Sequence, residues 1–185
     1  MLISPMVARG LQLQLLTGQR GGEIFTMTWD EVNETTGWWM IPAAKTKNGA
    51  THRVPFTEAA LALLAEMKAR HPNGDGWVFA GRDGGSFQSR AKKAIATLRN
   101  AGLLTGHYWR HDLRRTIATS MTTAGIPSST VNKVLNQQEG GPRVTGIYDR
   151  YSYDKEKRQA LDTWGRHLDV LIHGKASARV VPFRQ

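Results

Sequence analysis

The sequence predicts an α+β domain that is mostly helical and carries a small antiparallel β-sheet near its N-terminus. Three observations support this fold class. Apolar residues recur at helical spacing through most of the chain, two strand-like runs stand close together early in it, and an Asn48-Gly49 dipeptide lies between those runs. The 185 residues suffice for one domain with a buried core, and no internal repeat is present.

Each helix is indicated by apolar spacing together with a start or stop signal. The first ends at Gly18, Thr57 is a suitable N-cap for the third, Gly125 closes the fifth, and Pro127 suits the first turn of the sixth. The predicted helices cover residues 6–16, 20 to before 29, 57–69, 86–100, 111–124, 127–136, 144–151 and 154–172.

The predicted strands are Trp38 to Ile41 and His52 to Phe56. Asn48-Gly49 predicts a hairpin between them, because both residue types tolerate a positive φ. Residues 77–80 form a short strand or turn, and residues 71–76 and 81–85 are expected to be loops.

Composition excludes several classes of protein. Cysteine is absent, which removes disulfide frameworks, thiol catalysis and cysteine-ligated zinc. No apolar run is long enough to span a membrane, and the N-terminus does not resemble a signal peptide.

The net charge of +10 and the pI near 10.3 favour a polyanionic partner, with nucleic acid the leading candidate. The stretch from Arg90 to Arg115 holds seven cations and a single acidic residue, Asp112. Such a stretch suits a surface that lines phosphates.

Two constellations could bind a phosphate. His111 and Arg114 stand three residues apart and therefore share a helix face, from which both could contact a phosphate. The alternative is that both side chains lie on a solvated helix surface and bind nothing. Arg20 lies at a Gly-rich helix entry, where a guanidinium and backbone N–H groups can hold an anion. The alternative for Arg20 is a structural pair with Glu23.

A lysine and a group of tyrosines could supply proton transfer and a nucleophile. Lys47 lies at the predicted hairpin tip, where an ammonium could act as a general acid or simply protect an exposed strand pair, and Lys45 competes for the same role. A tyrosine hydroxyl can attack phosphorus, although most tyrosines serve packing. The tyrosines in question are Tyr148, Tyr151 and Tyr153.

A metal site is not expected. His107 and His111 have the spacing of two ligands on one helix, but no Glu lies between them and Arg110 would repel a divalent ion.

The order of these motifs resembles the catalytic domain of tyrosine recombinases of the phage integrase family. The resemblance runs from about Leu11 to His167 and rests on TGQRGGEI, KTKNGATHRVPF, HDLRR and TGIYDRY. It implies that Arg20 and Arg114 are the two catalytic arginines. Lys47 matches the hairpin lysine better than Lys45, because it lies seven residues before Val54.

The resemblance also assigns His111 to the His-x-x-Arg pair and Tyr148 to the nucleophile. One position departs from the family pattern, which has His or Trp where this chain has Gln137 after Leu135-Asn136. Glutamine can donate a hydrogen bond but cannot carry a proton. We therefore expect Gln137 to keep an orienting role and to reduce activity without abolishing it.

The implied function is site-specific DNA recombination of the phage or prophage integration type, through a 3′-phosphotyrosyl intermediate, without metal, ATP or any other cofactor. The implied partners are double-stranded attachment sites and three further copies, in a tetramer that forms on DNA from free monomers. The implied location is the bacterial cytoplasm, on the nucleoid. A non-catalytic DNA-binding module remains an alternative, because Ile126 to Val134 follows a helix and a Gly turn much as in a helix-turn-helix. An inactive prophage remnant is a second alternative.

The expected organisation is a catalytic domain over residues 1–173 and a loose tail over residues 174–185. Family members place a core-binding domain, and often an arm-binding domain, before the catalytic one. Both are expected to be absent here, which would make the chain a catalytic fragment.

Overall fold

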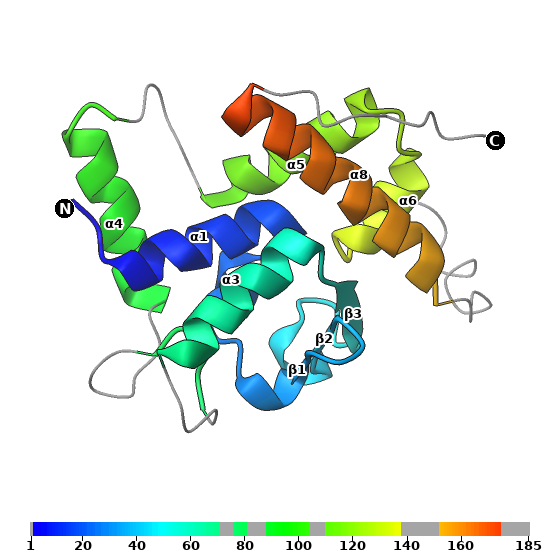
Figure 1. Cartoon of the computed structure of the whole chain (residues 1–185), viewed down its shortest axis with the longest axis horizontal. Helices are drawn as coiled ribbons and strands as arrows, with labels where there is room; N and C mark the ends of the chain where they lie inside the picture. The colour runs from blue at the N-terminus through cyan, green and yellow to red at the C-terminus, as the bar shows by residue number, and fades with distance from the viewer. Residues whose placement is uncertain (1, 71–75, 81–87, 104–109, 138–151, 175–185) are drawn as a thin grey trace.

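The computed structural model describes residues 2–70, 76–80, 88–103, 110–137 and 152–174 (Figure 1). Within these ranges, four side chains are not described, those of Gln88, Lys92, Arg110 and His111. The predicted helix over 144–151, most of the two predicted loops, and nearly all of the predicted tail lie outside the described residues.

Helix α1, Pro5–Thr17, lies at the centre of the helical layer (Figure 1). It ends as predicted at Gly18, whose φ of 71° is the left-handed conformation that glycine adopts without strain. Five helices pack against it: α2 (Gly21–Phe25), α3 (Glu58–Ala69), α4 (Gln88–Asn100), α5 (Arg110–Thr123) and α8 (Asp154–His173).

Local signals fix most helix ends. The hydroxyl oxygen of Thr57 accepts a hydrogen bond from the N–H of Ala60, so Thr57 caps α3 as predicted. Helix α6, Ser128–Val134, differs from its prediction at both ends. Pro127 is the N-cap, and the helix ends two residues before Asn136, whose φ of 49° is left-handed and cannot continue a helix.

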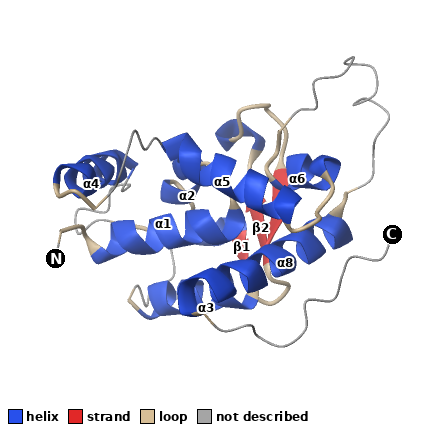
Figure 2. Ribbon diagram, turned by 90° about the horizontal axis from the view of Figure 1, so that it is seen from above, coloured by secondary structure: helices blue, strands red, loops and turns tan. Residues whose placement is uncertain are grey.

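The sheet has three antiparallel strands in the order β1 (Val32–Asn33), β2 (Trp38–Ile41) and β3 (His52–Pro55). Figure 2 shows it beside the helical layer, where β3 contacts α8. Trp39 pairs with Val54, and its ring stacks on Phe56, which lies just beyond the strand. The predicted pair of strands is thus confirmed, whereas β1 was missed because two residues carry no detectable alternation.

The predicted hairpin is confirmed, since β2 and β3 are consecutive antiparallel partners, but its connection is wider than a two-residue Asn48-Gly49 turn. The β2–β3 loop spans ten residues, 42–51, and begins with the 3₁₀ turn Ala43–Lys45. Gly49 has a positive φ of 68°, but Asn48 does not. The hydroxyl of Thr46 reaches both the Ala43 and Ala50 carbonyls and so holds a wider loop than a two-residue hairpin.

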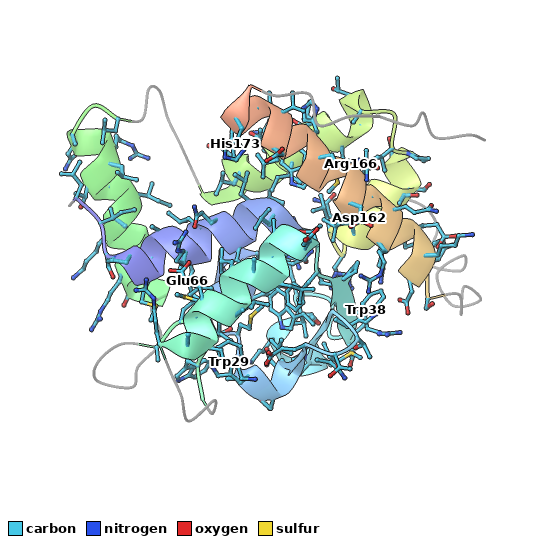
Figure 3. All side chains as sticks on the ribbon, viewed as in Figure 1. Trp29, Trp38, Glu66, Asp162, Arg166 and His173 are labelled. Carbon is cyan, nitrogen blue, oxygen red and sulfur yellow. The ribbon has the colours of Figure 1, made fainter. Side chains whose placement is uncertain are left out.

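Helix α8 is fastened to the sheet at its first turn. Arg53 of β3 forms an ion pair with Asp154. Trp38 of β2, labelled in Figure 3, has two guanidinium groups near its ring, that of Arg53 at 4.4 Å and that of Arg158 at 4.8 Å from the ring centre. The buried Trp164 indole donates a hydrogen bond to the Leu15 carbonyl at 2.8 Å. These contacts tie the last described helix to the first helix and the sheet.

Two helical glycines should respond to alanine in opposite directions. A Cβ at Gly10 would lie 2.2 Å from the buried Phe25 ring, whereas at Gly165 the nearest atom is a Thr57 methyl at 3.6 Å. We expect Gly10→Ala to destabilise the fold by about 1–3 kcal/mol through overpacking. Gly165→Ala should stabilise it by about 0.5–1 kcal/mol through helix propensity. Urea unfolding measures both, and equal effects would contradict the close packing of α1 on Phe25.

Candidate functional site

A cleft of about 810 Å³ brings together four of the six predicted site residues: Arg20, Lys47, Arg114 and Gln137. They come from the entry to α2, the β2–β3 loop, helix α5 and the residue that follows the α6 turn. Arg115 and Asn136 also line this cleft. Three of the cations, Arg20, Lys47 and Arg114, border a second hollow of about 380 Å³ as well.

Arg20 is both a structural and a cleft residue. Its guanidinium pairs with the buried Glu23 carboxylate at 2.9 Å, and that carboxylate also accepts the Arg20 backbone N–H at 2.8 Å. The other terminal nitrogen of Arg20 donates to the Asn136 carbonyl at 3.2 Å. The two readings of Arg20, a structural pair and an anion ligand, are therefore compatible.

Arg114 is buried, and it donates one hydrogen bond, from Nη1 to the Gly18 carbonyl at 3.0 Å. Its second terminal nitrogen, Nη2, is buried and makes no hydrogen bond to any described residue. Burial lowers the pKa of Arg114 to about 10; the nearby Arg20 charge acts in the same direction, while Glu23 opposes it. An anion in the cleft would supply the acceptor and the charge that this guanidinium lacks.

The two lysines of the β2–β3 loop have different environments. The Lys45 ammonium pairs with the buried Glu31 carboxylate and donates to the Thr26 carbonyl at 2.6 Å. Lys47 is exposed, and no described residue forms a hydrogen bond or ion pair with its ammonium. The structure thus gives Lys45 a folding role and leaves Lys47 available to a ligand in the cleft.

Gln137 is exposed at the cleft, where the chain leaves α6. Its backbone N–H donates to the Asn132 carbonyl at 2.9 Å, which closes the end of the helix. The left-handed Asn136 turns the chain between α6 and Gln137. The position is therefore set by backbone geometry.

Two residues that the sequence did not single out hold the end of α6 in place. The Val134 carbonyl accepts hydrogen bonds from the Gln19 amide at 2.9 Å and from the His52 ring Nε2 at 3.1 Å. Burial lowers the pKa of His52 to about 3, and the charges of Lys157, Arg114 and Arg20 add to this effect, so the ring is neutral and donates through Nε2. Position on the inner face of β3 is the only sequence signal that could have indicated His52.

His111 and Tyr148 are the two predicted site residues whose side chains are not placed. The His111 backbone belongs to α5, three residues before Arg114, as predicted. Tyr148 lies outside the described residues, and so does Tyr151. Tyr153 is the N-cap of α8, and the Lys133 ammonium lies 4.3 Å from its ring centre, which is a packing role.

No group of three or more His, Asp or Glu side chains within the described ranges could hold a metal ion. His107 lies outside those ranges. No helix in the described part of the chain is both long and apolar enough to cross a lipid bilayer.

Comparison with known proteins gives one consistent relationship. The sequence model of the phage integrase family matches residues 5–153. Prophage integrase IntA of Escherichia coli (strain K12) is 30% identical over 151 residues, which are 82% of this chain and 36% of that protein. The integrase of Shigella phage Sf6 is 26% identical over 159 residues, which are 84% of this chain and 40% of that protein. This chain therefore spans less than half the length of these relatives.

Two solved structures share the fold. The integrase from mycobacterium phage Brujita superposes with a TM-score of 0.63 at 19% identity, over 86% of this chain and 51% of that one. XerA recombinase superposes with a TM-score of 0.59 at 19% identity, over 84% of this chain and 55% of that one. The predicted family and the predicted fold class, a mostly helical domain with a small early sheet, are both confirmed.

Alanine substitutions at the two lysines of the β2–β3 loop should change the free energy of unfolding by clearly different amounts. Lys45→Ala leaves the buried Glu31 carboxylate without its cation, so we expect a loss of about 1–3 kcal/mol. Lys47→Ala removes an exposed side chain and should change the free energy of unfolding by less than about 0.5 kcal/mol. Urea unfolding at neutral pH measures both values. A Lys47→Ala variant as unstable as Lys45→Ala would contradict the contrast between the two lysines.

His52 should make the fold sensitive to mild acid. In the unfolded chain its pKa returns to 6.5, whereas in the fold burial lowers it to about 3. Unfolding therefore takes up a proton as the pH falls below about 6.5, and stability declines by up to about 1.4 kcal/mol per pH unit. In His52→Gln, which keeps a donor for Val134 without titrating, that decline should be shallower between pH 6.5 and 4. Parallel curves for the two proteins would refute a buried neutral His52.

Proposed function

This chain belongs to the phage integrase family, and we propose that it cleaves and rejoins DNA strands in the site-specific recombination of phage or prophage DNA. The observation that carries the proposal is the meeting of Arg20, Lys47 and Arg114 in one cleft. These cations come from segments far apart in sequence. Like charges repel, so their gathering in one cleft favours an anionic ligand over a surface that is merely solvated.

The cleft chemistry suits a phosphodiester. Attack on phosphorus gathers negative charge on the nonbridging oxygens, and two guanidinium groups can stabilise that charge. Arg114 offers a buried nitrogen with no acceptor among the described residues. The Arg20 guanidinium is held in position, because one of its terminal nitrogens donates to Glu23 and the other donates to the Asn136 carbonyl. In the proposed mechanism both arginines contact the phosphate, and Gln137 donates to one of its oxygens.

The proposed cleavage step balances without a co-reactant. The Tyr148 hydroxyl oxygen forms a bond to phosphorus and releases its proton to solvent, the bond from phosphorus to the 5′ oxygen breaks, and Lys47 later regains from solvent the proton that it donates. Lys47 donates a proton to that leaving oxygen, while His111 assists the arginines at the phosphate. The product is a 3′-phosphotyrosine and a free 5′-hydroxyl, and attack by a 5′-hydroxyl from another strand reverses the step. No metal, ATP or other cofactor takes part in this scheme.

The proposed partner is double-stranded DNA at attachment sites, and the net charge of +10 supports it. Exchange between two duplexes requires four cleavages, so we propose a tetramer on DNA that assembles from monomers. The proposed location is the bacterial cytoplasm, on the nucleoid, where such DNA lies. The relatives are named prophage and phage integrases, which agrees with this setting.

A strand-cleaving enzyme and a module that only binds DNA differ at Tyr148. The test is relaxation of supercoiled plasmid in EDTA, because it requires no knowledge of the target site. We expect the unmodified chain to relax plasmid and Tyr148→Phe to lose this activity by a factor of at least about 1,000, since no other group replaces the nucleophile. Denaturation during the reaction should trap protein covalently on DNA.

Tyr153→Phe is the matched control, because its ring packs at Lys133 and its hydroxyl has no proposed role. It should relax plasmid at the unmodified rate. Relaxation that persists in Tyr148→Phe would refute this nucleophile. Absence of both relaxation and covalent complex in the unmodified chain would favour the non-catalytic alternative or an inactive remnant.

A further inference from the structure

We propose that Asn136 is a positioning residue whose side-chain amide docks the β2–β3 loop, residues 42–51, onto the end of α6 and thereby fixes where the Lys47 ammonium stands over the cleft. The inference rests on the proposed role of Lys47 as proton donor. It adds a residue that the recombination chemistry itself does not require.

The docking contact is a reciprocal amide pair. The Asn48 Nδ2 donates to the Asn136 Oδ1 at 2.7 Å, and the Asn136 Nδ2 donates to the Asn48 Oδ1 at 3.3 Å. Asn48 directly follows Lys47, and Asn136 directly precedes Gln137. One contact thus joins the two segments that carry these cleft residues.

The α6 side of the contact is anchored. The Val134 carbonyl accepts from both Gln19 and His52, and the Asn136 carbonyl accepts from Arg20. Leu135, between them, is completely buried. Asn136 therefore has little freedom to move relative to Arg20.

Within the loop, the tip at residues 47–50 is organised by local hydrogen bonds but is only lightly attached to the rest of the fold. Thr46 holds the Ala43 and Ala50 carbonyls, and the Gly49 N–H donates to the Thr46 carbonyl. Lys47 to Ala50 are all exposed. Among the described residues, the Asn48–Asn136 pair is the one hydrogen-bonded link from residues 47–50 to another segment. The position of Lys47 over the cleft depends on that link.

Asn136 combines two properties that can be separated by substitution. Its φ of 49° is left-handed, a conformation that glycine adopts freely and asparagine tolerates. Its side chain supplies the amide for Asn48. Asn136→Gly therefore keeps the backbone turn that places Gln137 and removes only the docking amide.

The first test needs no DNA cleavage. Trypsin cuts after Lys47 when the loop leaves its docked position, and mass spectrometry follows that single cut. We expect Asn136→Gly to speed the cut by about three- to tenfold, the effect of losing an exposed hydrogen-bonded pair. Asn100→Gly, an exposed asparagine at the end of α4, is the matched control and should leave the rate unchanged. An unchanged rate in Asn136→Gly would overturn the docking.

The second test asks whether Asn136 acts through Lys47. Asn48→Ala and Asn136→Gly should each slow plasmid relaxation by about three- to tenfold, and the double variant should be no slower than either one, because both remove the same contact. In a Lys47→Ala background, Asn136→Gly should cause no further loss. An equal loss in that background would overturn the inference, since Asn136 would then act on Arg20 or Gln137. If the unmodified chain fails to relax plasmid while the trypsin result holds, the proposed function fails and the docking stands.

Discussion

The carbonyl oxygens at the end of α6 are the constraint on which the cleft depends. A helix leaves its last carbonyls without partners, and their partial negative charge attracts donors. Here the Val134 carbonyl, at the end of the helix, accepts from the Gln19 amide and the His52 ring, and the Asn136 carbonyl, two residues beyond the helix, accepts from the Arg20 guanidinium. The donors lie 82 to 116 residues before these acceptors in the sequence, so the entry to α2, the strand β3 and the residue before Gln137 cannot shift independently.

The segments that meet here bring together more positive charge than the neighbouring acidic side chains neutralise. Glu23 is the acidic side chain bonded to Arg20, and Arg114 stands close enough for the two guanidinium charges to repel each other. Burial and this repulsion both disfavour the charged form of Arg114 and therefore lower its pKa. Both costs fall when an anion enters, because it offers acceptors and opposite charge together. Before any ligand arrives, the cleft therefore holds positive charge and a buried guanidinium nitrogen without an acceptor among the described residues, which is what the proposed binding of a phosphate requires.

Sequence reasoning recovered what local chemistry determines and missed what depends on long-range contacts. Thr57 and Gly18 act through neighbouring backbone, so the helix ends they set were predictable. The role of Lys45 was not predictable, because its partner Glu31 lies on a separate turn and the two meet only through the fold. His52 was missed for the same reason. The four predicted residues that line the cleft were chosen through a motif order that resembles a family, and no periodicity or spacing rule would have assembled them in one cleft.

The two lysines of the β2–β3 loop have different roles: one fixes the loop to the core, and the other extends toward the cleft. Lys45 forms an ion pair with the buried Glu31 and holds the base of the loop against the core. Lys47, two residues on, is left exposed and is held over the cleft through its neighbour Asn48. An exposed amide pair shifts a local equilibrium by only about three- to tenfold, so the loop is biased toward the cleft and not locked there. This arrangement suits the role of proton donor that we propose for Lys47, because the leaving oxygen moves as its bond to phosphorus breaks and the ammonium has to follow it.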